Sequence, residues 1–315
     1  MHPVFARLAA ALCLAMPATG LAQSGDDSFG SAVLMANSYD VIANQAYLTA
    51  SGSELKLDVY RPNQAKAAVP VVLYFHGGGW VAGTREGAAL AALPYMQMGF
   101  AVVNVEYRMA KTALAPAAVE DTLCALQWVG RNAKRFNFDL AKVVVTGTSA
   151  GGHLALATGM IPSDSPFTNQ CAANEPAWSG AYTNAAPKVA AVVNWYGITD
   201  VADMLQGPNV RSYAVAWFGS SPTAERMELA RRVSPISYVR ADGPPVLTIH
   251  GDADPLVPYA HATRLKQLMD KAGEKNQLLT IKGGGHGGFN AAQQQQAYEA
   301  VRGFLRELGI VPAQP

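Results

Sequence analysis

The chain has 315 residues, half of them hydrophobic, and its charged side chains nearly cancel to a net charge of +1. A length in this range suits either two average domains or one larger α/β unit. The balanced charge argues against a basic surface for nucleic acid and against an acidic tail, so we expect no nucleic-acid partner.

The N-terminus has the composition of a secretory signal peptide. A basic start precedes an apolar stretch from Leu8 to Pro17, and the small residues Gly20 and Ala22 suit a cleavage site. The apolar stretch is too short to span a bilayer. We therefore expect residues 1–22 to be removed after Ala22 and the mature chain to be secreted or periplasmic, with no membrane span.

Two cysteines, Cys124 and Cys171, would remain in the mature chain. In an oxidising compartment they could form a disulfide, but two buried free thiols are also common. The sequence leaves both possibilities open, and it leaves the oligomeric state open as well.

Apolar runs and helical patterns alternate along the rest of the chain. After a loose polar arm at residues 25–38, the alternation of Leu55, Leu57 and Val59 predicts a half-exposed edge strand. Further strands are predicted at Pro70–Phe75, Ala101–Val105, Lys142–Thr146, Val189–Trp195, Pro245–His250 and Gln277–Ile281. Helices are predicted at Glu86–Met98, Pro116–Arg131, Ala150–Met160 and Tyr259–Lys271. This order predicts an α/β fold with a mostly parallel central sheet, covered by helices on both faces.

Two long irregular stretches interrupt the alternation, at about residues 161–188 and 203–238. Both carry several aromatic residues and follow strand or helix ends on the edge where the working loops of a parallel sheet lie. Long insertions at that edge often form lids or pocket walls, although plain surface decoration is the alternative. We therefore predict a single domain over residues 23–315 with two lid-like insertions.

The segment Gly147-Thr148-Ser149-Ala150-Gly151 lies between a predicted strand and a predicted helix. Glycines two residues either side of a serine are needed when the backbone turns so sharply that a Cβ would strike its neighbours. This G-x-S-x-G pattern predicts a nucleophile elbow, with Ser149 as the reactive residue. Its hydroxyl would need a base and an acid from elsewhere in the chain.

His286 is the predicted base, because the glycines around it let the loop after a strand carry an imidazole close to another loop. Asp254, just after the buried strand that ends at His250, is the predicted acid. Asp252 is the alternate acid, although we expect it to stabilise the turn by accepting backbone N–H bonds. The chain order Ser149, Asp254, His286 is that of the α/β-hydrolases.

The run His76-Gly77-Gly78-Gly79-Trp80 follows another predicted strand and supplies donors for an oxyanion. Gly78 and Gly79 are the predicted donors from this loop, and Ala150, after the nucleophile, is the third. We expect His76 to brace the loop rather than react. We expect Trp80 to form a wall of the substrate-binding site, with buried packing as the alternative.

These motifs resemble those of the α/β-hydrolase esterases with a His-Gly-Gly-Gly loop. Within that group the chain is similar to the bifunctional feruloyl and acetyl-xylan esterase-like family. Further matching segments are Glu106-Tyr107-Arg108, Tyr196-Gly197-Ile198-Thr199-Asp200 and Ser234-Pro235-Ile236. The resemblance implies an α/β-hydrolase fold and a two-step acyl transfer that needs no metal or cofactor. It also implies a small-molecule or carbohydrate substrate, with acetyl or feruloyl esters of plant-wall carbohydrate as the leading class.

Three other functions stay open at this point. A general carboxylesterase or lipase acting on short acyl esters would use the same residues. A peptidase of the prolyl-oligopeptidase kind shares the triad but is disfavoured because no propeller-sized region precedes the domain. A non-catalytic carbohydrate-binding or adhesion protein is disfavoured because all three triad candidates are present.

Overall fold

The computed structural model describes residues 27–173, 186–220 and 223–311. The predicted signal peptide and its cleavage site lie outside these ranges. Helix α1 (Asp27–Ser38) belongs to a separate unit that ends at Asn37. The prediction of a loose arm over residues 25–38 was wrong for this stretch, whose Ala32, Leu34 and Met35 are strong helix formers.

The described residues from Ser38 onward form an eight-stranded sheet in the order β1-β2-β4-β3-β5-β6-β7-β8. The strands are β1 (Tyr39–Ala50), β2 (Ser53–Pro62), β3 (Val69–Phe75), β4 (Ala101–Val105), β5 (Phe138–Thr148), β6 (Val189–Trp195), β7 (Val246–Gly251) and β8 (Asn276–Ile281). Strands β3 to β8 are parallel to one another, and β1 and β2 pair antiparallel. This arrangement confirms the predicted mostly parallel sheet.

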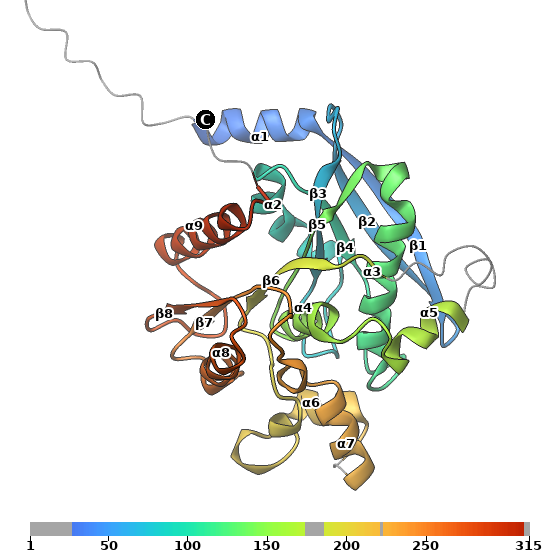
Figure 1. The fold of residues 1–315 in the computed structure, drawn as a ribbon, viewed down its shortest axis with the longest axis vertical. Helices are drawn as coiled ribbons and strands as arrows, with labels where there is room; N and C mark the ends of the chain where they lie inside the picture. The colour runs from blue at the N-terminus through green and yellow to red at the C-terminus, as the bar shows by residue number, and fades with distance from the viewer. Residues whose placement is uncertain (1–26, 174–185, 221–222, 312–315) are drawn as a thin grey trace, which may run out of the picture. The chain divides into compact units, whose positions relative to one another are not determined.

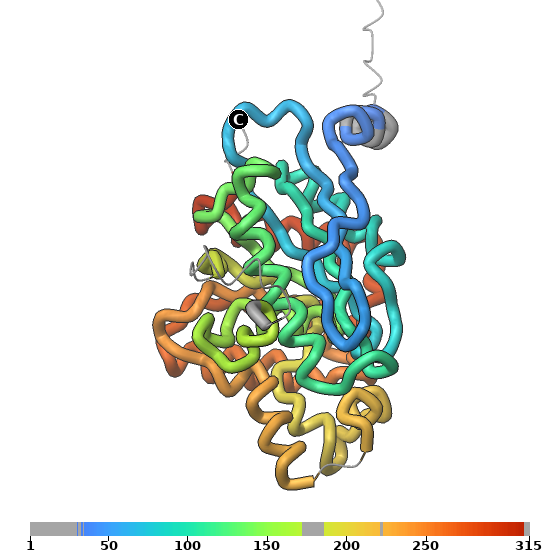
Figure 2. The backbone as a smooth tube through the Cα atoms, turned by 90° about the vertical axis from the view of Figure 1, so that its right-hand side faces the viewer, coloured from blue at the N-terminus to red at the C-terminus, as the bar shows by residue number. Residues whose placement is uncertain are grey.

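The edge strand β1 was not predicted, and β2 is not the edge strand that its alternation suggested. β1 and β2 run side by side as a long hairpin (Figure 2). Their pairing shifts register twice along β1, first between Ile42 and Gln45 and again between Ala46 and Leu48. Such irregularities break the period-two pattern of side chains by which a strand is identified in a sequence.

Alternate residues of the central strands enter two separate cores. In β3, Val71 and Leu73 pack in one core, whereas Val72 and Tyr74 pack in the other. Figure 1 shows α2 and α9 on one side of the sheet and α3 and α4 on the other. The bounds are η1 (Glu86–Ala92, 3₁₀), α2 (Leu93–Gln97), α3 (Ala117–Phe136), α4 (Ala150–Met160), α8 (Ala260–Ala272) and α9 (Ala291–Glu307). Helices therefore cover both faces, as predicted.

The helix predicted at Glu86–Met98 is divided into η1 and α2. Pro94 lies in the first turn of α2. A proline has no N–H to donate and its ring clashes with the carbonyl one turn earlier, so it is tolerated at a helix start and not within a continuous helix.

Cys124 and Cys171 form a disulfide between α3 and α5 (Asn169–Ala173), with the two Cα atoms 5.2 Å apart. Of the two states left open by the sequence, the structure therefore contains the disulfide. The bond closes a loop with a sequence separation of 47 residues. In the chain-entropy description, closing a loop of this length lowers the entropy of the unfolded chain and so stabilises the folded state by about 4 kcal/mol.

The two stretches predicted as insertions contain short helices in their described parts. The first holds η2 (Pro166–Thr168) and α5, while residues 174–185 lie outside the described ranges. The second holds η4 (Ala202–Met204), η5 (Gly207–Asn209), α6 (Ser212–Phe218), α7 (Ala224–Arg232) and η6 (Pro235–Tyr238). Within the described ranges, no helix combines the length and the apolar character needed to cross a membrane.

Candidate active site

The predicted site residues lie at the carboxyl ends of parallel strands. Phe75, the last residue of β3, pairs with Gly147 near the end of β5. Gly251 at the end of β7 pairs with Ile281 at the end of β8. Because these strands run in the same direction, the loops that follow them meet at one edge of the sheet.

Ser149 occupies a tight turn between β5 and α4. Its backbone has φ +57° and ψ −119°, and its N–H donates to the Trp195 carbonyl at the end of β6. A Cβ added at Gly147 or at Gly151 would lie under 3.0 Å from backbone atoms, including the Phe75 carbonyl oxygen. The two glycines therefore allow the strained turn to lie against β3, as the elbow pattern predicts.

The structure brings Ser149, His286 and Asp254 into one chain of hydrogen bonds. The Ser149 Oγ lies 2.8 Å from His286 Nε2, and His286 Nδ1 lies 2.7 Å from Asp254 Oδ2. A carboxylate only accepts, so Nδ1 carries the hydrogen and Nε2 offers its lone pair to the serine hydroxyl. This is the tautomer that a general base for Ser149 requires.

The Asp254 side chain is fully buried, and its Oδ1 accepts the N–H groups of Leu256 and Val257. Burial favours the protonated form of this carboxyl, but hydrogen bonds from His250, from His286 and from the backbone outweigh it. They hold the pKa of Asp254 well below its ordinary value. Asp254 is therefore charged at neutral pH and can serve as the counter-charge of a protonated His286.

Asp252, the alternate acid, points elsewhere. Its Oδ1 accepts the N–H of Gly283 at 2.6 Å, which ties the loop after β7 to the loop that carries His286. This is the turn-stabilising contact that we expected for Asp252, and it leaves Asp254 as the carboxylate beside the imidazole.

The glycine loop after β3 lies beside the elbow. Gly78 and Gly79 line the same cavity as Ser149, and Ala150 begins helix α4, where its N–H has no acceptor within the helix. Gly78 has φ +119°, a conformation that side chains rarely adopt. The three predicted oxyanion donors therefore lie around Ser149, and their role as donors stays a prediction.

His76 and Tyr107 support this loop from behind. The Tyr107 hydroxyl donates to the His76 carbonyl at 2.9 Å, and the two rings stack with centroids 4.3 Å apart. Burial lowers the pKa of His76, which keeps the imidazole neutral. Among the described residues no hydrogen bond joins the His76 ring to Ser149, Asp254 or His286, and its Nε2 has no hydrogen-bond partner, which agrees with the bracing role that we expected.

The prediction that Trp80 binds substrate is wrong. Its side chain is fully buried, stacks on Trp217 of α6 with centroids 4.3 Å apart, and donates its Nε1–H to His153 Nδ1. His153 in turn contacts the Val233 carbonyl through Nε2, and burial lowers the pKa of His153 to about 4. The large apolar ring gains more from this buried stack than from an exposed pocket wall.

Other residues line the cavity of about 450 Å³ in front of Ser149, and sequence reasoning gave them no site role. They are Val81, Thr148, Tyr196, Tyr213 and Leu256. The Tyr196 ring meets the His286 ring edge to face, with centroids 4.8 Å apart. Tyr213 comes from the second predicted insertion, and its hydroxyl donates to the Leu256 carbonyl at 3.2 Å. The aromatic content of the insertion was the only signal for Tyr213.

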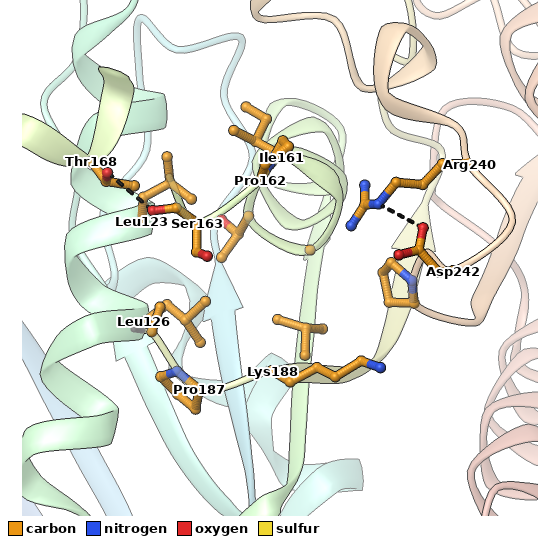
Figure 3. A pocket seen from close by; sticks show the side chains of 15 residues that line it. Leu123, Leu126, Ile161, Pro162, Ser163, Thr168, Pro187, Lys188, Arg240 and Asp242 are labelled. Carbon is orange, nitrogen blue, oxygen red and sulfur yellow. Dashed lines mark hydrogen bonds and ion pairs between the residues drawn. The ribbon is translucent and has the colours of Figure 1, made fainter. Parts of the chain in front are cut away.

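A second cavity, of about 180 Å³, lies at the other end of the sheet, where Val189 begins β6 (Figure 3). Arg240 and Asp242 form an ion pair on one side of it, and Thr168 bonds the Ser163 carbonyl on another. The described part of the first predicted insertion therefore lines this cavity and not the one that contains Ser149. Across the described residues, no three His, Cys, Asp or Glu side chains are grouped so that they could hold a metal ion.

Comparison with known proteins points to esterases. The model of the BD-FAE family matches residues 57–269. The esterase LipQ of Mycobacterium tuberculosis is 27% identical over 81% of this chain and 59% of its own length. The ethyl acetate hydrolase of Pseudomonas putida is 28% identical over 78% of this chain and 75% of its own length. The chain spans between 46% and 62% of the length of the first three curated relatives.

Solved structures have the same fold. A truncated carbohydrate esterase from gut microbiota is 30% identical, with a TM-score of 0.71, and the match covers 86% of this chain and 97% of that one. Esterase 2 of Thermogutta terrifontis with bound propionate is 24% identical, with a TM-score of 0.70, and the match covers 88% and 97% of the two chains. The second comparison supports the α/β-hydrolase fold alone.

Replacing Asp254 by Asn tests the assignment of the acid. The amide keeps the size of the carboxylate but removes its charge and favours the wrong tautomer of His286. We expect kcat for a short aryl ester to fall on the order of 10⁴-fold, with little change in KM, in steady-state kinetics of purified protein.

Asp252→Asn is the matched control. Because the Asp252 side chain accepts the Gly283 N–H and not a hydrogen of His286, and an asparagine oxygen can accept that N–H as well, we expect the kcat of this variant to stay within a few-fold of the wild-type value. If Asp252→Asn lost more activity than Asp254→Asn, the acid of the triad would be Asp252.

Proposed function

Because this chain belongs to the BD-FAE family, we propose that it is a carboxylic-ester hydrolase that works through an acyl-enzyme on Ser149. The observation that carries this proposal is the continuous hydrogen-bond chain from the Ser149 hydroxyl through His286 to the buried carboxylate of Asp254. Nucleophile, base and acid are thus already in contact before substrate binds, as acyl transfer to serine requires.

In the acylation step, the Ser149 Oγ attacks the ester carbonyl while His286 Nε2 takes the hydroxyl proton. The charge of Asp254 stabilises the imidazolium that forms. The negative charge on the former carbonyl oxygen is accepted by backbone N–H groups of Gly78, Gly79 and Ala150. Each such donor is typically worth about 3 to 4 kcal/mol of the barrier.

Collapse of the tetrahedral intermediate breaks the ester C–O bond, and the imidazolium of His286 donates its proton to the departing alcohol. Water then enters beside His286, loses a proton to Nε2 and attacks the acyl carbonyl. The acid leaves, Ser149 recovers its proton, and the site returns to its starting state. Leu256, which lines the cavity, is 47% exposed, so the cavity opens to solvent beside it. The alcohol can leave and water can enter at this opening.

Ser149→Ala tests the proposed chemistry. We expect ester hydrolysis to fall by at least 10⁴-fold, because the covalent route is lost. A fluorophosphonate probe should label the wild-type protein at Ser149, as mapped by peptide mass spectrometry, and should leave the variant unlabelled. Undiminished hydrolysis by the folded variant would refute the nucleophile and with it the proposed mechanism.

We propose acetyl and feruloyl esters of plant-wall carbohydrate as the substrates, in line with the family and with the similar gut carbohydrate esterase. The cavity favours uncharged esters, because the described residues that line it include no Lys, Arg, Asp or Glu. Tyr213, Val81 and Leu256 offer apolar surface for an acyl group at the mouth. The second candidate is a general esterase of short acyl esters, favoured by the similarity to an ethyl acetate hydrolase.

A panel of esters separates these two candidates. We expect kcat/KM on acetylated xylan and on feruloylated oligosaccharides to exceed that on ethyl acetate by at least tenfold, because the sugar contributes binding that a small alcohol lacks. Release of acetate and ferulate, followed by chromatography, gives the rates. Equal or higher values on ethyl acetate would favour the second candidate.

We also propose that the protein is exported, with the signal peptide removed after Ala22. The Cys124–Cys171 disulfide supports an oxidising compartment, because cytosolic thiols are kept reduced. We expect N-terminal sequencing of the protein recovered from the periplasm or medium to begin at Gln23. Recovery of the full-length chain from the cytoplasm alone would contradict export.

A further inference from the structure

The geometry points to His250 as a positioning residue for the triad. It fixes the orientation of the Asp254 carboxylate, which accepts a hydrogen bond from His286. This inference rests on the proposed function, since it concerns the acid of the same site. His250 is not one of the residues that line the substrate cavity. It would therefore act through Asp254 and not on the substrate.

His250 lies near the end of β7 and is fully buried. Its Nε2 lies 3.0 Å from the Val257 carbonyl oxygen and 3.2 Å from Asp254 Oδ2. Its ring also meets the ring of Tyr259 at 76°, with centroids 5.8 Å apart. These contacts hold the imidazole in one orientation. Its Nε2 is turned toward the loop after β7 that contains Asp254 and Val257, which we call the acid loop.

The hydrogen on this imidazole can be assigned from its neighbours. A carbonyl and a carboxylate only accept, so Nε2 of His250 must carry a hydrogen, which the two acceptors share. Nδ1 is buried and has no hydrogen-bond partner among the described residues. A hydrogen there would be buried and unsatisfied, so Nε2 is the ring nitrogen whose hydrogen the surrounding contacts require.

The shared hydrogen closes a ring of contacts around the acid loop. Asp254 Oδ1 accepts the N–H of Val257, the carbonyl of Val257 accepts from His250, and the same His250 hydrogen faces Asp254 Oδ2. The loop backbone and the carboxylate are thus bound to one imidazole. Neither can move without weakening the contact to the other.

Each carboxylate oxygen of Asp254 has two donors. Oδ1 has the N–H groups of Leu256 and Val257, and Oδ2 has His286 and His250. With donors on both oxygens, rotation of the carboxylate breaks at least one hydrogen bond on each side. The Oδ2 lone pair that accepts from His286 Nδ1 is therefore kept in place while the imidazole changes charge during the reaction.

This role predicts a specific kinetic signature. Loss of the His250 donor leaves Oδ2 with His286 alone, so the carboxylate is held less firmly and the His286 imidazolium is less well stabilised in the transition state. Substrate binding in the ground state does not involve His250. We therefore expect kcat to fall and KM to stay unchanged, a pattern typical of an interaction that matters only in the transition state.

The experiment compares three substitutions at this position. His250→Leu removes the donor at similar volume. His250→Asn places its amide near the position of Nδ1, out of reach of Asp254, and keeps a polar side chain in case the leucine variant fails to fold. His250→Gln places its amide near the position of Nε2 and restores a donor to Asp254.

The concentration of functional sites is measured in each preparation by fluorophosphonate titration, and kcat is expressed per labelled serine, which corrects for partly unfolded protein. We expect His250→Leu and His250→Asn to lose about 10- to 100-fold in kcat, with KM within twofold of wild type. We expect His250→Gln to recover most of this loss. A packing role alone would lower thermal stability and the number of labelled serines, but not kcat per labelled serine.

His261→Leu is the matched control. His261 is also a buried histidine, on α8, where its Nδ1 accepts the Thr199 N–H. Its substitution should lower the melting temperature without changing kcat per labelled serine.

The inference is overturned if both donor-free variants keep wild-type kcat per labelled serine, or if His250→Gln is as slow as they are. Ser149→Ala separates this failure from that of the proposed function. If Ser149→Ala is inactive while the His250 variants are normal, only the role of His250 is refuted. If Ser149→Ala remains active, the proposed mechanism fails as well.

Discussion

The backbone of the Ser149 turn lies so close to the end of β3 that a Cβ at Gly147 or Gly151 would collide with the Phe75 carbonyl. This close approach brings the elbow and the glycine loop after β3 into a single wall of the cavity. It holds a serine at φ +57°, a conformation that costs of order 1 to 3 kcal/mol unless the surroundings enforce it. The N–H bond from Ser149 to the end of β6 helps to enforce it. The other site residues are placed relative to this turn.

The acid loop provides a charged carboxylate in a position that is buried from solvent. The charge of Asp254 is stabilised by donors on both carboxylate oxygens, and two of these donors are histidines with different positions in the site. His286, the proposed base, lines the cavity, whereas His250 is buried and contacts Asp254, Val257 and the ring of Tyr259. Asp252 links the two loops from outside by accepting the Gly283 N–H. The loops after β7 and β8 therefore behave as one support for the imidazole.

Much of the fold and the central site residues could be predicted because their signals are local. Glycines around Ser149, the glycine run before Trp80 and the carboxylates after His250 each stand at the end of a recognisable apolar strand. A parallel sheet brings such ends together without further information. Strand β1 escaped prediction because its register irregularities erase the alternation, and the helix at Glu86–Met98 is divided because of Pro94.

Trp80 shows where local signals fail. Its position beside the oxyanion loop suggested a pocket wall, but its partner Trp217 comes from α6, far along the chain, and their stack buries both rings. The same helix contributes Tyr213 to the cavity. Whether an aromatic side chain is buried or lines a pocket depends on which distant segment packs beside it.

By itself, the sequence determined the α/β class and predicted Ser149, with its two supporting glycines, as the nucleophile, because both follow from residues close together along the chain. Only the tertiary structure decided between Asp254 and Asp252 as the neighbour of His286, the pairing of Cys124 with Cys171, and the lining of the cavity. These features depend on contacts between segments far apart in the chain. The periodic pattern that burial leaves in a sequence identifies single strands and helices, but it does not say which distant segments pack against each other.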